Sequence, residues 1–274
     1  MAGNYGPDPD ADRREWLLLT GASVLASIAV LPYTLTLTKT SIEKANAQRQ
    51  AAGKRAISPP LMVVLSAAQS SVLFGGLSAL GLRLARPMGL GAPHIEAALR
   101  GRSPELDRGE LRAYALVGAG SALFIGIMDR VLFGKLQVAF KKAGMREPEA
   151  WKGFLASFYG AIGEEVLMRL GLQTIVAAGV RRLWGEKALP PSDSTMWIAI
   201  LVSNVAFGAG HLPAAATIVP LTPTLVVRTI LLNALIGTVF GRLYWKKGLE
   251  ASMVAHGSAD FVLHVGGALL GREK

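Results

Sequence analysis

The sequence predicts an all-α protein, a polytopic transmembrane helical bundle with about six to eight spans. Of its 274 residues, 51% are hydrophobic and only 18% are charged, and the mean hydropathy is +0.38. A soluble domain of this length is usually far less apolar. The apolar residues also gather in runs that reach roughly the 20 residues that a membrane helix needs. These runs are residues 16–38, 60–82, 113–133, 154–178, 196–219, 223–245 and 249–270.

The domain organisation follows from the short distances between these runs, which leave no room for a separate soluble domain. The connectors are polar and loop-sized, and they lie at residues 39–59, 83–112, 134–152 and 181–195. We expect three parts along the chain. Residues 1–15 form a disordered tail rich in Pro, Gly and Asp. Residues 16–150 form N-terminal transmembrane helices and loops, and residues 151–272 form a core that carries the polar motifs.

The stretch "DRREWLLL" at residues 12–19 has the look of a twin-arginine signal. However, no small-residue cleavage site follows it cleanly, and further apolar runs come after it. We therefore expect this stretch to begin the first transmembrane helix.

The charge of the chain is strongly basic and is concentrated in the predicted loops. Lys and Arg number 29 against 19 Asp and Glu, a formal net charge of +10. In a membrane protein this excess suits anionic lipid headgroups, so we expect membrane lipids as partners and no nucleic acid. Consecutive loops are all basic, so charge leaves the orientation of the termini open. Richness in Ala, Gly and Arg indicates a bacterial source, and hence a multi-pass protein of the bacterial cytoplasmic (inner) membrane.

The chain contains no cysteine, which excludes thiol catalysis, disulfides and cysteine-ligated metals. Three polar groups stand out in the apolar second half and are the candidates for chemistry. They are Glu164, Glu165 and Arg169 in "GEEVLMRLGLQ", His211 in "NVAFGAGHLP", and His256 with Asp260 in "HGSADFVLH".

Glu164, Glu165 and Arg169 would be costly to expose to lipid. A charged residue at the membrane centre costs about 2.5 to 3.5 kcal/mol, so the three together would cost about 8 kcal/mol. In a helix Glu165 and Arg169 are four residues apart, in the favourable order for an ion pair. Glu164 projects about 100° away and is left without that partner. We therefore expect a structural Glu165–Arg169 pair and a Glu164 carboxylate that is available for chemistry.

The two histidines lie on other helices and are expected to converge on Glu164. A carboxylate with two imidazoles in a partly dry cavity can polarise a water molecule, take its proton and stabilise the oxyanion that forms on a peptide carbonyl. Asn204, two turns before His211, is expected to support the site. His264 is interpreted as a packing or helix-end residue, and Gly237 with Gly241 as a GxxxG motif for close helix packing.

The order of EExxxR, FxxxH and HxxxN/D resembles the CPBP family, which comprises CAAX prenyl proteases and bacteriocin-processing (ABI) membrane proteins. The motifs stand here as "EEVLMR", "FGAGH" and "HGSAD", and the resemblance covers roughly residues 150–270. It implies a glutamate-dependent intramembrane endopeptidase, a hydrolase that works without a cofactor or a bound metal. Its substrate would be a protein or peptide in the membrane.

The resemblance also implies roles for the individual residues. Glu164 and His211 would activate water, His256 and Asp260 would lie on the oxyanion side, and Glu165 with Arg169 would hold the site together. The best-studied catalytic members carry Asn where this chain has Asp260, and an ionised carboxylate cannot donate a hydrogen bond. Asp260 is therefore either protonated or orients His256 through an i,i+4 contact. We favour the orienting role.

Two alternatives to this function stay open. Members of the family also act without catalysis, as membrane regulators or bacteriocin-immunity proteins. A metal-dependent intramembrane protease with Glu164, His211 and His256 as zinc ligands is the second alternative, although the chain has no HExxH motif. A bacterial source argues against a prenylated CAAX substrate and favours a bacterial membrane protein, a peptide or a C-terminal sorting tail.

Overall fold

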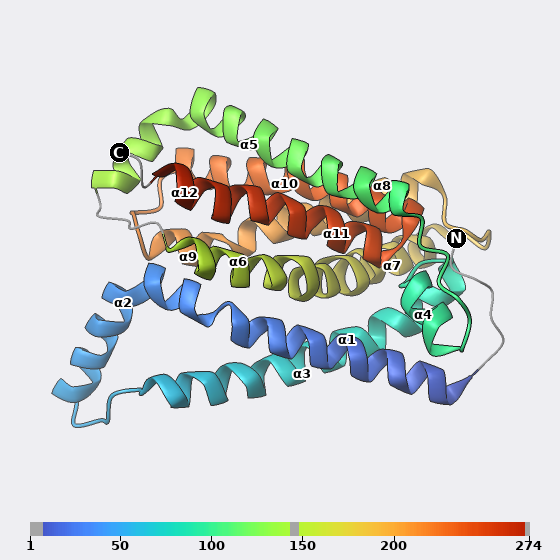
Figure 1. Ribbon diagram of the computed structural model, residues 1–274, viewed down its shortest axis with the longest axis horizontal. Helices are drawn as coiled ribbons and strands as arrows, with labels where there is room; N and C mark the ends of the chain where they lie inside the picture. Colours follow the sequence, from blue (N-terminus) through green and yellow to red (C-terminus); the bar gives the residue numbers. More distant parts are fainter. Residues whose placement is uncertain (1–7, 143–147, 272–274) are drawn as a thin grey trace.

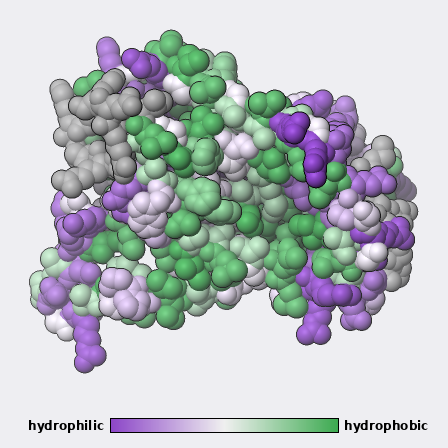
Figure 2. All heavy atoms as spheres, in the orientation of Figure 1, coloured by the Kyte–Doolittle hydropathy of each residue, from purple (hydrophilic) through white to green (hydrophobic). Residues whose placement is uncertain are grey.

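The computed structural model describes residues 8–142 and 148–271, and within these ranges the chain forms helices and connectors without a strand. The long helices lie side by side along one direction (Figure 1). Hydrophobic residues form a broad band across the middle of the molecule, between two hydrophilic ends (Figure 2). This arrangement confirms the all-α membrane bundle.

The first helices form a layer of their own. Helix α1 (Pro9–Ala29) packs antiparallel against α3 (Pro59–Ala85), and α2 (Leu31–Ala51) points away from the bundle (Figure 1). Between α1 and α2 the chain bends by 47°. Pro32 explains this bend, because it lacks the N–H that would continue the helical hydrogen bonds. The apolar run predicted as a single helix is therefore broken.

Two predictions for this region are wrong. Helix α1 begins at Pro9, where the Asp8 carboxylate accepts a hydrogen bond of 3.0 Å from the Ala11 amide. Residues 8–15 are thus a capped helix start, and the rest of the predicted tail, residues 1–7, lies outside the described residues. The connector predicted at 39–59 is helical up to Ala51, the end of α2.

The remaining helices enclose the polar motifs. Helix α5 (Arg108–Lys142) covers one side, after a short 3₁₀ turn η1 (Arg86–Met88) and helix α4 (Pro93–Leu99). The EExxxR motif lies in a continuous helical run of four segments. The run comprises α6 (Ala150–Phe158), the π-helical segments η2 (Tyr159–Glu164) and η3 (Val166–Gln173), and α7 (Thr174–Trp184).

The other two motifs lie on the helices that follow. His211 ends α8 (Asp193–Gly210) and precedes the short α9 (Leu212–Ala216); α10 (Pro223–Lys247) then leads to the last run. That run comprises α11 (Leu249–Asp260), the π-helical η4 (Phe261–Gly266) and α12 (Gly267–Gly271). Single π-helical turns are often found at functional sites, and here they occur in both runs that carry carboxylates.

Four described helices are long and apolar enough to cross a membrane, or five if the bent pair α1 and α2 is one span. The four are Pro59–Met88, Arg108–Phe140, Asp193–Ala216 and Pro223–Lys247. This number is lower than the predicted six to eight. The predicted runs at 154–178 and 249–270 are not among the four, and the first of them carries Glu164, Glu165 and Arg169.

Close contacts between helices fix the layer order, which is α5, α11, the α6 to α7 run, and then α1 with α3 (Figure 1). At Gly118 of α5, a Cβ atom would lie 1.9 Å from the carbonyl oxygen of Ala255. At Gly81 of α3, it would lie 2.4 Å from that of Leu170. Because only glycine permits these approaches, the two helices that carry the motifs are held from both sides.

Candidate active site

The two polar motifs on the α6 to α7 run and on α11 meet in the interior of the bundle, because these helices lie against each other. Glu165 is the centre of this cluster and is fully buried. Its Oε1 lies 2.8 Å from Nδ1 of His256, and its Oε2 accepts a hydrogen bond from the Ser252 hydroxyl. The same Oε2 lies 3.4 Å from Nε of Arg169. The predicted ion pair is therefore present, and the acceptor sites of Glu165 are occupied.

Arg169 connects this cluster to α8. Its Nη1 donates a hydrogen bond of 2.8 Å to Oδ1 of Asn204, and the Asn204 amide donates to the Thr238 hydroxyl at 3.2 Å. Both Arg169 and Asn204 are fully buried. A buried guanidinium needs such partners, because burying it unpaired would cost several kcal/mol. The supporting position predicted for Asn204 thus corresponds to a contact with Arg169.

The GxxxG motif on α10 does more than bring helices together. A Cβ at Gly237 would lie 2.6 Å from Oδ1 of Asn204, and one at Gly241 would lie 2.8 Å from Oε1 of Gln173. Gln173 in turn donates a hydrogen bond of 3.1 Å to the Gly241 carbonyl. The two glycines therefore leave space for the polar side chains around Arg169. This role goes beyond the close helix packing that the GxxxG motif predicts.

His256 lies between three carboxylates. Its Nδ1 faces Glu165, whereas its Nε2 lies 3.6 Å from Oε2 of Glu164 and 3.6 Å from Oδ1 of Asp260. The ring stacks on Phe240, with 4.6 Å between ring centroids. The side chain of Glu164 is 19% exposed and that of Asp260 is 14% exposed, against 1% for Glu165. Glu164 is thus the carboxylate of the adjacent pair that stays partly exposed.

The carboxylate of Asp260 is confined on its second side by backbone. A Cβ at Gly160, in the π-helical η2, would lie 1.9 Å from Oδ2 of Asp260 and 3.1 Å from Nε2 of His256. A larger residue at this position would displace the Asp260 carboxylate.

His211 is the one motif residue that the structure does not bring into this cluster. It caps the end of α8, where its Nδ1 lies 2.9 Å from the Phe207 carbonyl. The Phe207 ring lies 4.6 Å from the His211 ring and 6.3 Å from the His256 ring, measured between centroids. Among the described residues, His211 makes no ion pair with a carboxylate. The expected contact with Glu164 is therefore made by His256, while the His211 ring contacts Phe207.

A metal site is not assembled from these side chains. Within the described residues, no group of three or more His, Asp or Glu side chains has the geometry to hold a metal ion. Glu164, His211 and His256, the zinc ligands of the alternative hypothesis, belong to no such group.

Sequence reasoning missed four residues of the site, and one signal was available for two of them. Ser252 precedes His256 by four residues, and Gln173 follows Arg169 by four, so each lies on the same helix face as a motif residue. Phe240 and Gly160 carry no such signal, because their roles depend on how α10 and η2 pass the site.

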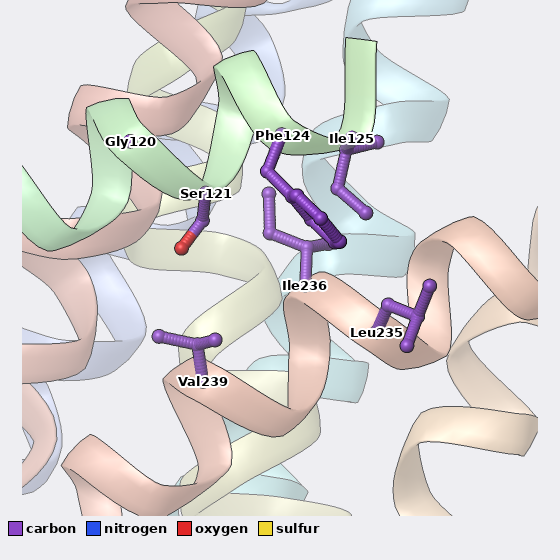
Figure 3. A pocket seen from close by; sticks show the side chains of 7 residues that line it. All are labelled: Gly120, Ser121, Phe124, Ile125, Leu235, Ile236 and Val239. Carbon is purple, nitrogen blue, oxygen red and sulfur yellow. The ribbon is translucent and has the colours of Figure 1, made fainter. Parts of the chain in front are cut away.

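An apolar hollow of about 280 Å³ lies between α5 and α10 (Figure 3). Its walls come from side chains on both helices, which point toward one another (Figure 3). The lining residues are Gly120, Ser121, Phe124, Ile125, Leu235, Ile236 and Val239. None of the motif residues lines it, so the hollow is separate from the carboxylate cluster.

The chain was compared with known proteins. No curated protein and no solved structure gave a significant match. The model of the family described as "Type II CAAX prenyl endopeptidase Rce1-like" matches residues 146–262, the segment that contains EEVLMR, FGAGH and HGSAD. With all three motifs and the clustered carboxylates in this segment, residues 146–262 belong to the CAAX prenyl protease family, as the resemblance of the motifs indicates.

Proposed function

We propose that the protein is a glutamate-dependent intramembrane endopeptidase that hydrolyses a peptide bond in a membrane-associated protein or peptide. The family match supports a protease of the CAAX type in the membrane. The observation that carries the glutamate assignment is the asymmetry of the adjacent pair. Glu165 is fully buried and bonded to His256, Ser252 and Arg169, whereas Glu164 faces the same histidine and stays partly exposed.

Glu164 is the general base in this proposal. The 3.6 Å between its Oε2 and Nε2 of His256 is longer than a direct hydrogen bond, and one water molecule can bond to both atoms. Glu164 takes a proton from this water as the water oxygen attacks the carbonyl carbon of the peptide bond. The proton then passes to the leaving amine as the C–N bond breaks, so one water is consumed and the carboxylate is regenerated.

His256 stabilises the oxyanion in this proposal. Its Nδ1 is held by Glu165, so Nε2 is directed toward Glu164 and Asp260. A protonated Nε2 donates to the negative oxygen of the tetrahedral intermediate. With both nitrogens protonated, the ring also balances part of the charge of the three carboxylates around it. Asp260, which lies 3.6 Å from Nε2 of His256, orients the His256 ring.

His211 takes part only if the end of α8 closes onto the substrate. Catalytic contacts often tighten only in the complex with substrate, and the His211 ring lies 4.6 Å from that of Phe207, which lies 6.3 Å from that of His256. We keep His211 as the second imidazole of the reaction on this basis. The substrate class that we propose is a bacterial membrane protein, peptide or sorting tail in the cytoplasmic membrane.

The experiment compares membrane-protein termini by mass spectrometry in cells that express wild type, Glu164→Gln or His211→Ala at equal levels. Specific cleaved termini should be present with wild type and absent with both variants. Glu105→Gln makes the same chemical change on an exposed loop residue, and should match wild type. Identical termini in wild type and Glu164→Gln would overturn catalysis by Glu164 and favour a membrane regulator.

A chelator separates the two kinds of protease. Cleavage by detergent-solubilised protein should continue in 1,10-phenanthroline if Glu164 acts without a metal. Loss of cleavage that added Zn²⁺ restores would replace this proposal by the metal-dependent alternative.

A further inference from the structure

The polar contacts of the site continue beyond the three motifs, through a histidine that the motifs do not include. Oδ1 of Asp260 lies 3.6 Å from Nε2 of His256 and 3.8 Å from Nε2 of His264. On its other side, Nδ1 of His264 lies 3.0 Å from the hydroxyl of Tyr33. Tyr33 belongs to α2, the helix that points away from the bundle (Figure 1). A line of polar groups thus joins α2 to the proposed oxyanion side.

We propose that His264 and Tyr33 are positioning residues, which hold the Asp260 carboxylate against His256 for the reaction. This inference rests on the proposed function, because it assigns the two residues to the same hydrolytic site. It replaces the interpretation of His264 as a packing residue.

The chemistry of the imidazole ring determines how Tyr33 acts. In a neutral ring one nitrogen carries the proton and the other accepts a hydrogen bond. When the Tyr33 hydroxyl donates to Nδ1 of His264, the proton sits on Nε2, which faces the Asp260 carboxylate. The opposite tautomer would turn a lone pair toward the negative oxygen. The Asp260 carboxylate can only accept, so it favours the form with the proton on Nε2, and the Tyr33 hydroxyl supports that form by donating to Nδ1.

The surroundings make this orientation specific. Oδ1 of Asp260 lies between the two imidazoles, and its Oδ2 is confined by the backbone of Gly160. The backbone of His264 is itself fixed against α6, since a Cβ at Gly153 would lie 2.8 Å from the His264 carbonyl oxygen. Losing the His264 ring therefore removes one of the groups that define the position of the carboxylate, while the backbone stays in place.

A simpler reading is that the Tyr33 contact only fastens α2 to the bundle. None of the α2 residues, all of which the structure describes, is buried, so side-chain bonds matter to its position. The structure offers a matched control for this reading. Thr36, three residues after Tyr33, accepts a hydrogen bond of 3.0 Å from Lys152 of α6, and this bond fastens α2 without touching Asp260.

The test measures kcat and KM of purified full-length variants in liposomes. The probe is a fluorogenic peptide that copies a cleavage site found by terminus mass spectrometry. Tyr33→Phe and His264→Leu should each lower kcat about three- to tenfold, the effect of one hydrogen bond on a barrier, with KM unchanged. His264→Gln should restore most of the rate, because its amide can accept from Tyr33 and donate to Asp260. Thr36→Val should match wild type.

A double variant distinguishes the positioning role from a contact that only attaches α2 to the bundle. Tyr33→Phe should have no further effect in the His264→Leu background, since Tyr33 acts through that ring. Equal losses in Thr36→Val and Tyr33→Phe, or full kcat in both Tyr33→Phe and His264→Leu, would overturn the proposal. If His264→Leu does not fold, Tyr33→Phe and His264→Gln still decide between these outcomes.

Glu164→Gln in the same assay separates this inference from the proposed function. No cleavage by Glu164→Gln, together with unchanged Tyr33 and His264 variants, overturns the positioning role alone. Wild-type cleavage by Glu164→Gln overturns the proposed function, and with it a positioning role at that site.

Discussion

Single side chains decide which of two adjacent glutamates is available for chemistry. Glu164 and Glu165 are neighbours in the chain, yet only Glu165 is tied to Arg169, Ser252 and His256. The difference arises because successive helical residues point in different directions. Glu165 is therefore buried against α11, whereas Glu164 stays partly exposed. Substitutions at this scale should separate stability from catalysis.

Replacing Arg169 should mainly destabilise the protein. Arg169→Met leaves the Glu165 carboxylate and the Asn204 oxygen buried without their cationic partner, a loss that typically costs about 3 to 5 kcal/mol. Thermal unfolding of the purified protein in detergent measures this effect. Arg182→Met, at an exposed position, is the control, and an equal midpoint for the two variants would contradict the buried network.

Replacing Gly160 should mainly affect activity. In Gly160→Ala the added methyl occupies the place of Oδ2 of Asp260, and the flexible carboxylate can rotate away while the helix stays. We expect cleavage to fall about tenfold or more, the range found when supporting contacts of a site are lost, with little change in the unfolding midpoint. Gly126→Ala is the control, since a Cβ there meets no described atom within 4 Å. Wild-type cleavage by Gly160→Ala would refute a positioned Asp260.

At the scale of elements, charged side chains at one end of the bundle join helices from both halves. Arg86 of η1 lies 2.7 Å from Glu15 and 2.6 Å from Asp12, both on α1. Arg100 extends the group, at 2.9 Å from Asp12. Glu250, in the first turn of α11, accepts hydrogen bonds from the amides of His94 and Ile95 of α4. These contacts anchor α1 and α11 to the same short connector.

Breaking the buried part of this group should loosen α1. In Arg86→Met, Glu15, which is 2% exposed, loses its cationic partner, at a cost of about 2 kcal/mol after allowance for the partial exposure of Arg86. Limited proteolysis should then cut the α1 to α2 region faster than in wild type. Arg83→Met, at an exposed position on α3, serves as the control. Unchanged proteolysis of Arg86→Met would show that the ion pairs do not hold α1.

At the scale of the whole molecule, the family segment does not make its own core. The largest buried cluster combines Leu19 of α1 and Phe74 of α3 with Leu170, Met196 and Leu249 from the second half. The N-terminal helices therefore cover a face of the α6 to α7 run that would otherwise expose apolar and polar groups together.

A fragment without the first two spans should fail to form the site. Deleting residues 1–85 removes α1, α2 and α3, so the cluster around Leu170 loses its members on α1 and α3, and Gly81 no longer lies against Leu170. We expect aggregation on size-exclusion chromatography in detergent and loss of cleavage. Deletion of residues 1–7 alone is the control and should leave both unchanged. A monodisperse, active fragment would show that the second half folds by itself.

Much at this scale follows from the chain alone, because lipid leaves few choices. A long apolar run in lipid forms a helix, because its backbone polar groups find no water and must bond to each other. Exposing a charged side chain to lipid is also costly, and this cost places Glu164, Glu165 and Arg169 inside the bundle. The ion pair of Glu165 and Arg169 also follows from local spacing. The bend at Pro32 and the helical start at Pro9 were missed, since apolar run length does not report where a helix breaks or how far it extends past the apolar part.

What the amino-acid sequence by itself determined is therefore the class of fold, the polar motifs and the family to which they point. Only the tertiary structure decided that Glu164 faces His256 and that the His211 ring contacts Phe207. It also decided that Gly160, Gln173, Ser252 and His264 belong to the neighbourhood of the site. The physical reason is that helix spacing dictates partners only within one helix, whereas partners on different helices depend on how closely the backbones cross.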